Sequence, residues 1–268
     1  MGILERHHVT AVGPDDGQPM LFAHGFGCDQ SMWRHVAPAF ADQYRVITFD
    51  HVGAGGPGVD YDEQKYSTLQ GYAADVLEIV RALDLREVVL VGHSVSAMIG
   101  ALAVIEEPDR FDKLVLVAPS PRYIDDDSYT GGFSREDVEE LLDSLASNYL
   151  GWSSAMAPVI VGNSDRPQLG SELTASFCRM DPEIARQFAR ATFFSDNRED
   201  LARISVPTLV LQCSDDVLAP DSVGEYVAKA VPDATLVHLA ATGHCPNLSA
   251  PEETVAAIDH FLRHLQVA

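Results

Sequence analysis

The sequence predicts an α/β fold in which helices cover both faces of a mostly parallel sheet. Six short runs rich in aliphatic and β-branched residues have the composition of buried strands, at residues 20–23, 45–49, 88–91, 114–118, 208–211 and 235–239. The segments between them show apolar residues at helical spacing, most clearly at residues 69–83. Because strands and helices alternate along the chain, we expect parallel strands with helices on both sides of the sheet.

This alternation stops after the fourth predicted strand, and no strand-like run occurs before residue 200. The stretch reads as successive helices broken at Pro158, Gly162, Pro167 and Pro182. We interpret residues 121–200 as a helical lid inserted into a core formed by residues 1–120 and 201–268, all within one structural domain. A last helix is expected at residues 251–265, because it opens with a proline and its apolar residues recur at helical spacing.

The charge balance and composition exclude several classes of function. The 18 basic and 40 acidic side chains give a formal net charge of -22, which disfavours binding to nucleic acids and to anionic membrane surfaces. No apolar run long enough to span a membrane and no secretory signal pattern occurs, so we expect a cytoplasmic protein. The four cysteines are widely separated and the histidines are mostly isolated, which predicts reduced thiols, no metal site and no cofactor.

Ser94 is the candidate nucleophile, because it lies where the predicted strand at 88–91 turns directly into a helical stretch. A serine at such a corner holds its hydroxyl above the carboxyl end of the sheet, and the following helix directs the positive end of its dipole toward developing negative charge. Gly92 supplies a small neighbour for this turn, but Ser96 stands where the usual Gly-x-Ser-x-Gly pattern has its second glycine. The alternative is that Ser94 only caps the helix.

His244 and Asp216 are the candidate general base and orienting acid. His244 follows the last predicted strand, where a neutral imidazole can take the proton from Ser94. Asp215 and Asp216 both follow the strand at 208–211, and Asp216 is favoured because it lies four residues before a proline. The alternatives are a surface histidine and an aspartate-rich turn. The chain order Ser, Asp, His, each after a predicted strand, is that of the α/β-hydrolases.

Two backbone amides are expected to bind the oxyanion of a tetrahedral intermediate. The loop at residues 24–27, His-Gly-Phe-Gly, follows the first predicted strand and would present the N–H of Phe26. The second donor would be the N–H of Val95, directly after the nucleophile. The alternative for the loop is a simple tight turn. The glycine-rich segment at residues 50–58 does not match a dinucleotide-binding pattern, and we expect a turn beneath the active site there.

Several motifs together resemble those of the RsbQ family. They are Gly-His-Ser-Val-Ser-Ala-Met-Ile-Gly at 92–100, Asp-His-Val-Gly at 50–53, Ser-Pro-Arg-Tyr at 120–123, Gly-Gly-Phe at 131–133 and Gly-His-Cys-Pro at 243–246. This family includes a bacterial stress-phosphatase regulator and the plant karrikin and strigolactone receptor hydrolases. The resemblance covers nearly the whole chain, and the family shares the serine at position 96.

The resemblance implies an α/β-hydrolase core under a four-helix lid, with a small apolar pocket between them. By match of position the pocket would be lined by Phe26, Val95, Tyr123, Phe133, Leu141, Trp152, Phe193 and Leu218, and by Met156, where the plant receptors usually have an aromatic residue. Large aromatic area with few hydrogen-bonding groups suits a compact hydrophobic ligand.

Two functions are compatible with these features. The first is a serine hydrolase that cleaves a small hydrophobic ester or lactone through an acyl-enzyme. The second is a sensor that binds or slowly hydrolyses such a molecule and signals to a regulatory protein partner, which the resemblance implies to be phosphatase-like. Carbon–carbon bond hydrolases and cofactor-free haloperoxidases use the same triad and stay open as alternatives.

Overall fold

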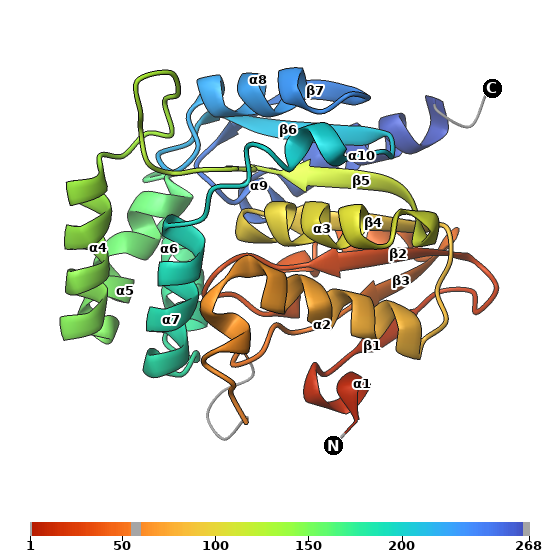
Figure 1. The fold of residues 1–268 in the computed structure, drawn as a ribbon, viewed down its shortest axis with the longest axis horizontal. Helices are drawn as coiled ribbons and strands as arrows, with labels where there is room; N and C mark the ends of the chain where they lie inside the picture. The colour runs from red at the N-terminus through yellow and green to blue at the C-terminus, as the bar shows by residue number, and fades with distance from the viewer. Residues whose placement is uncertain (1, 55–59, 265–268) are drawn as a thin grey trace.

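The computed structural model describes residues 2–54 and 60–264, and its centre is a seven-stranded sheet (Figure 1). The strands are β1 (Thr10–Val12), β2 (Gln18–Ala23), β3 (Tyr44–Thr48), β4 (Val88–His93), β5 (Phe111–Val117), β6 (Thr208–Asp215) and β7 (Ala234–Thr242). They lie in the order β1-β3-β2-β4-β5-β6-β7, and β1 pairs antiparallel with β3 while the other neighbours are parallel. The predicted mostly parallel sheet is therefore confirmed. Strand β1 was not predicted, because this short edge strand is exposed throughout and has no apolar run.

Helices pack on both faces of the sheet, as predicted. Outside the segment between β5 and β6, the α-helices are α1 (Ile3–Arg6), α2 (Leu69–Ala82), α3 (Val95–Glu106), α8 (Asp221–Ala230), α9 (Pro246–Ser249) and α10 (Pro251–His264). Alternate residues of β4 enter two separate apolar clusters, with Val88 and Leu90 facing α2 and α3, and Val89 and Val91 facing the α10 side. The predicted end of the last helix at Leu265 lies outside the described residues.

Short 3-10 helices connect several of these elements: η1 (Gln30–Trp33), η2 (Ala37–Phe40), η3 (Lys65–Ser67), η4 (Pro108–Arg110) and η5 (Leu201–Arg203). Residues 50–54 of the glycine-rich segment follow β3. The side chains of His51 and Val52 in this segment are buried. Residues 55–58 of that segment lie outside the described part of the chain.

Four helices lie between β5 and β6: α4 (Arg135–Ser147), α5 (Tyr149–Val161), α6 (Pro167–Phe177) and α7 (Pro182–Phe193). Pro167 and Pro182 stand in the first turns of their helices, and Gly162 ends α5 with a φ of 64°. The predicted break at Pro158 is wrong, since this residue lies inside α5 and its carbonyl accepts the N–H of Gly162 at 3.0 Å. The division of the chain into a core and a lid at residues 121–200 stays a prediction.

The parallel sheet brings three loops to one edge. The arrow of β5 in Figure 1 points toward α4–α7, and β4, β6 and β7 run parallel to β5, so the residues after these strands lie at the end of the sheet next to these helices. Ser94 follows β4, Asp216 follows β6 and His244 lies just after β7. The sheet topology therefore gathers residues that are more than a hundred positions apart in the chain.

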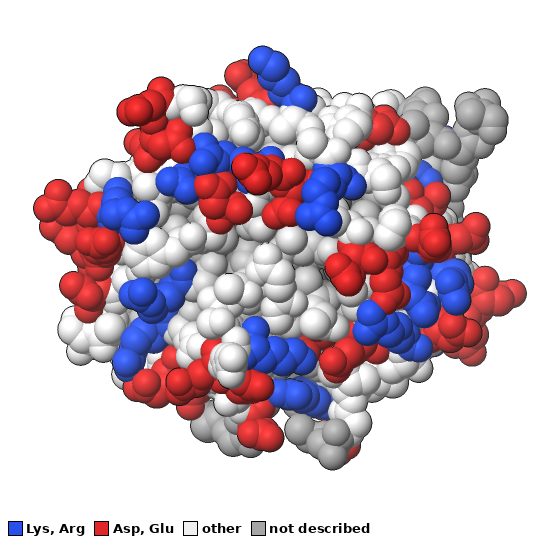
Figure 2. All heavy atoms as spheres, viewed as in Figure 1, with Lys and Arg blue, Asp and Glu red and all other residues white. Residues whose placement is uncertain are grey.

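The charged residues are spread over the surface. Figure 2 shows basic side chains interspersed with acidic ones over the visible face, with acidic residues gathered at the edge formed by α4. Helix α4 contains Glu136, Asp137, Glu139, Glu140 and Asp143. Among the residues that the structure describes, no helix is long and apolar enough to cross a membrane.

Candidate active site

Ser94 stands in a tight turn that only close packing permits. Its φ of 58° and ψ of -124° are unusual for a residue with a side chain, and they turn the chain directly from β4 into α3. A Cβ at Gly92 would lie 2.2 Å from the carbonyl oxygen of Ser96, so this position requires glycine. The side chain of Ser94 makes no capping hydrogen bond to α3, which contradicts the reading as a simple helix cap.

The side chains of Ser94, His244 and Asp216 form a continuous hydrogen-bonded chain. The Oγ of Ser94 lies 2.6 Å from Nε2 of His244, and Nδ1 of His244 lies 2.6 Å from Oδ2 of Asp216. All three residues are buried. Because a carboxylate only accepts, Nδ1 of His244 carries the proton and Nε2 is free to accept the serine proton. The surface-histidine alternative is wrong for His244.

The structure distinguishes the two candidate aspartates. Asp215 ends β6 with an exposed side chain, and its carbonyl accepts the N–H of Gly243 at 3.0 Å. Asp216 points inward, and its second oxygen Oδ1 accepts the backbone N–H groups of Leu218 at 2.8 Å and Ala219 at 3.1 Å. Asp216 therefore forms an aspartate turn and also faces the imidazole. The turn holds the carboxylate in the orientation that His244 needs.

Ser96 has a structural role that the sequence pattern did not reveal. Its hydroxyl donates to the carbonyl of His24 at 2.5 Å and accepts from Nε2 of His51 at 2.7 Å. The ring of His24 in turn donates from Nδ1 to Gly25 at 2.9 Å and accepts the N–H of His51 at 3.0 Å. A glycine at position 96 would make none of the side-chain bonds. Ser96 thus connects the nucleophile turn with the loop that carries Phe26.

The loop at residues 24–27 lies directly against the nucleophile turn. A Cβ at Gly25 would be 3.2 Å from the Cβ of Ser94 and 2.7 Å from Nδ1 of His93. The N–H of Val95 is at the start of α3, where a helix has no intrahelical acceptor for its first amides. This arrangement suits an oxyanion hole formed by the amides of Phe26 and Val95, and their role stays a proposal.

His93 is bonded to the loop that carries His244. Its Nε2 donates to the backbone carbonyl of His244 at 2.8 Å, and the two rings lie 5.3 Å apart between centroids. Burial, and then the nearby His244, lower the pKa of His93 from its ordinary value of 6.5 to about 3. A neutral His93 does not repel the imidazolium that forms at His244 during proton transfer. The Gly-His-Ser motif contained this residue, but nothing local signalled its long-range bond.

A small apolar cavity of about 30 Å³ opens onto Ser94 and His244. The predicted pocket residues that line it are Phe26, Tyr123, Trp152, Phe193 and Leu218. Residues that were not predicted also line it, namely Cys28, His93, Ile160, Leu173, Phe177, Thr192 and Cys245. The volume corresponds to about two water molecules. Larger open grooves elsewhere, such as one of about 620 Å³ between α5 and α6, contain no triad residue.

Aromatic packing makes the cavity small. The rings of Trp152 and Phe177 stack at 5.6 Å, and Phe26 packs edge-on against both at 6.2 and 5.8 Å. On the other side Tyr123 packs against Phe193 at 4.9 Å. Burial raises the pKa of Tyr123 well above its usual range, and the nearby hydroxyl of Ser94 offsets this in part. Tyr123 is therefore a neutral phenol beside the nucleophile.

The remaining predicted pocket residues are not among those that line the cavity. Leu141 and Met156 are partly buried against the main apolar cluster, and Phe133 packs edge-on against Phe193 at 6.5 Å without lining the cavity. Val95 is buried as the first residue of α3. Any contact of these side chains with a substrate stays a prediction.

The cysteines are free thiols, and two of them, Cys28 and Cys245, line the cavity. Burial raises the pKa of both, so they are protonated and poor nucleophiles beside Ser94. Within residues 2–54 and 60–264, no three His, Cys, Asp or Glu side chains are grouped to hold a metal ion.

Comparisons with known proteins agree with this geometry. The model of the Alpha/beta hydrolase family matches residues 20–258. The chain is 40% identical to the Karrikin insensitive 2 receptor CA of Petunia hybrida, covering 98% of each protein. It is 41% identical to the Strigolactone esterase D14 of Arabidopsis thaliana, covering 97% of this chain and 96% of that protein. The hydrolase olei00960 of Oleispira antarctica superposes with a TM-score of 0.94 at 40% identity, covering 97% and 96% of the two chains. The predicted resemblance to the receptor hydrolases is confirmed.

The substitution Asp216→Asn separates the two aspartates by their effect on turnover. Its amide would face Nδ1 of His244 and force the wrong tautomer, so we expect kcat for a small ester to fall by about 10³–10⁴-fold. Asp215→Asn is the matched control and is expected to change kcat less than about twofold, because its side chain is exposed. Steady-state kinetics of both variants measure this, and equal losses would contradict the assignment.

The pKa of His93 predicts how stability depends on pH. Between pH 6.5 and about 3 the unfolded chain binds a proton at this position that the folded chain does not, so the free energy of unfolding decreases as the pH falls through this range. Relative to pH 7.5, His93 then costs the folded state about 1.4 kcal/mol at pH 5.5. Urea denaturation at both pH values should show a smaller decrease for His93→Gln. An unchanged pH dependence in the variant would show that His93 titrates normally.

Proposed function

The chain belongs to the alpha/beta hydrolase family, and from this premise we propose that it cleaves a small hydrophobic ester or lactone through an acyl-enzyme on Ser94. The observation that carries the proposal is the unbroken hydrogen-bonded chain from Asp216 through His244 to Ser94, with the serine facing an apolar cavity. Ester cleavage is the reaction for which this arrangement supplies a nucleophile, a base and two amide donors at once.

In the first half of the reaction, Oγ of Ser94 attacks the ester carbonyl while Nε2 of His244 takes its proton. The amides of Phe26 and Val95 stabilise the negative charge on the carbonyl oxygen. The protonated His244 then gives its proton to the leaving alcohol, which in a lactone stays attached to the acyl group. In the second half, His244 activates a water molecule that hydrolyses the acyl-enzyme and restores Ser94.

The lining of the cavity supports an uncharged substrate. No Lys, Arg, Asp or Glu side chain is among the residues that line it, and most of the lining is aromatic or aliphatic. An anionic substrate would find no cation there, and its desolvation would be costly. The phenol of Tyr123 and the hydroxyl of Thr192 are the polar groups that can orient a compact ester or lactone.

The substitution Ser94→Ala tests the nucleophile. We expect ester and lactone turnover to fall to the background rate, because no other residue of the cavity lining is paired with a base. Time-resolved mass spectrometry with small aryl esters and butenolide lactones follows product and any covalent adduct. The wild-type protein should show an adduct that maps to the peptide containing Ser94, and Ser154→Ala, in the groove outside the cavity, should behave like wild type. Turnover that survives in Ser94→Ala would rule out this mechanism.

A second candidate is a ligand sensor that acts through the same site, because the cavity is nearly closed. The cavity measures about 30 Å³, so we expect a ligand as large as a butenolide ring to shift side chains of α5 and α6, the helices that cover it, such as Trp152 and Phe177. Binding then favours a different arrangement of these helices, and a partner protein can recognise the change. By resemblance this partner is a phosphatase-like regulator.

The expected cytoplasmic location stays a prediction.

Hydrogen exchange of Ser94→Ala with and without a small lactone tests the sensor. We expect the amides of α5 and α6, which carry Trp152 and Phe177 over the cavity, to change their exchange rates at least about threefold, while those of β4 and β5 stay constant. Saturation with the ligand is followed by the fluorescence of Trp152, with Trp33 buried in the opposite apolar cluster as the constant background. Saturation without any exchange difference in α5 and α6 would contradict a sensor that works through these helices.

A further inference from the structure

The backbone of the catalytic histidine is bonded to helix α5. The N–H of His244 donates to the carbonyl of Ile160 at 2.9 Å, in the last turn of α5. The side chain of Ile160 lines the catalytic cavity. Ile160 therefore lines the substrate site with its side chain, and its carbonyl bonds to the loop that carries His244.

The last carbonyls of a helix lack intrahelical donors and need partners from elsewhere. In α5 these partners come from the loop of His244 and from Asn163. The Nδ2 of Asn163 donates to the carbonyl of Val161 at 2.8 Å and to the carbonyl of Thr242, at the end of β7, also at 2.8 Å. The two segments touch closely, since a Cβ at Gly243 would lie 1.8 Å from the oxygen of Val161.

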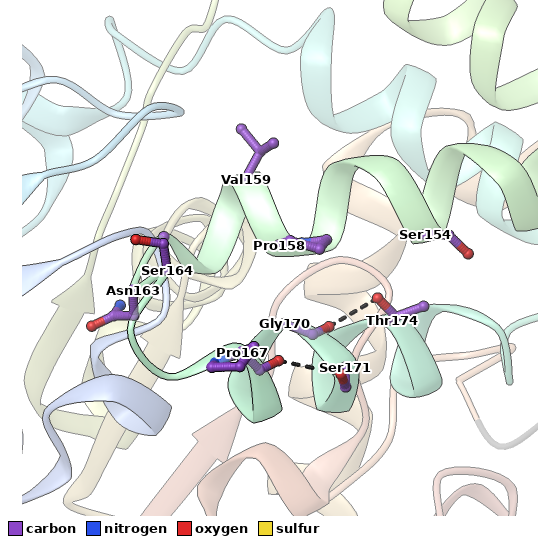
Figure 3. Close-up of a pocket in the computed structure, with 10 residues that line it drawn as sticks. Ser154, Pro158, Val159, Asn163, Ser164, Pro167, Gly170, Ser171 and Thr174 are labelled. Carbon is purple, nitrogen blue, oxygen red and sulfur yellow. Dashed lines mark hydrogen bonds between the residues drawn. The ribbon is translucent and has the colours of Figure 1, made fainter.

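Arg166 fixes the side chain of Asn163 from the other side. Its Nη2 donates to Oδ1 of Asn163, and its Nη1 donates to the carbonyl of Ser249 at 2.7 Å, at the end of α9. The amide of Asn163 therefore has a fixed orientation, with its nitrogen toward the loop of His244. Figure 3 shows Asn163 in the turn between α5 and α6.

We propose that Asn163 is a positioning residue for the reaction. Its side chain joins the end of α5 to the loop of His244, so that the position of this helix sets the position of the imidazole. The proposal rests on the proposed function of the triad. It also gives substrate contacts a route to the base, because Trp152 and Ile160 of α5 both line the cavity. A substrate that fits these side chains holds α5, and α5 then holds His244.

The test uses Asn163→Gly and Asn163→Asp in the full chain. Asn163 has a φ of 57°, which glycine adopts freely and aspartate tolerates, so both variants keep the turn but lack the Nδ2 donor. Asn163 lines the groove between α5 and α6 and does not line the cavity. Since a displacement of about 1 Å in a catalytic group can cost about 10²-fold, we expect kcat to fall about tenfold in both variants with KM unchanged within about twofold.

The control is Arg34→Ala. The ion pair of Arg34 with Glu172 also joins one of these helices, α6, to the end of η1, and the hydrogen bonds and ion pairs of Arg34 do not include the loop of His244. We expect wild-type kcat and KM for this variant. A tenfold loss of kcat in Arg34→Ala as well would show that any weakened contact of these helices has the same effect, and it would overturn the special role of Asn163.

A readout without turnover separates this proposal from the proposed function. The proton between Nδ1 of His244 and Asp216 should give a far-downfield proton resonance in NMR, because this short hydrogen bond deshields it. We expect the resonance to shift or broaden in both Asn163 variants and to stay in Arg34→Ala. Wild-type resonance and kcat in the Asn163 variants, or a rise in KM alone, would overturn the proposal. A wild-type protein that cleaves no ester would instead contradict the proposed function, and the resonance would still decide the role of Asn163.

Discussion

The backbone turn at Ser94 is held in a conformation that costs free energy, and the surrounding contacts must compensate for it. Close packing does so on each side: Gly92 admits the carbonyl of Ser96, and Gly25 admits the ring of His93 and the Cβ of Ser94. The same contacts bring the loop of Phe26 against the start of α3. The backbone strain at Ser94 and the positions of the Phe26 and Val95 amides, the proposed oxyanion donors, therefore depend on one packed junction between β2, β4 and α3.

Buried histidines with neutral hydrogen-bond partners support this junction. His24, His51 and His93 bond to backbone groups or to the hydroxyl of Ser96, and burial lowers the pKa of each. His244 differs because a buried carboxylate faces its Nδ1. His24, His51 and His93 can thus stay uncharged and support the site, while His244 takes up and releases the proton in the proposed reaction. This division of roles follows from the partner of each ring and not from the residue type.

The covering helices unite the enzymatic and the sensing interpretations of the site. Their aromatic side chains close the cavity above Ser94, and the end of α5 bonds to the backbone of His244. We expect a ligand to shift these side chains, and the same helices are bonded to the backbone of His244 through the carbonyl of Ile160. The two proposed functions, ester turnover and a conformational signal, would therefore both depend on this one set of contacts.

The sequence by itself determined the alternation of strands and helices, because composition and hydrophobic period are local properties of the chain. It also placed the three triad candidates, Ser94, Asp216 and His244, directly after predicted strands. It also supplied the family motifs around Ser94 and His244. Only the tertiary structure decided that Asp216 and not Asp215 faces the imidazole, since the two differ by which side of a turn they point to. The long-range contacts of His93 and Asn163 and the closure of the cavity by Phe177 likewise emerged only in the fold. Each depends on contacts between segments far apart in sequence, up to 151 positions for His93 and His244, and no local pattern encodes such a distance.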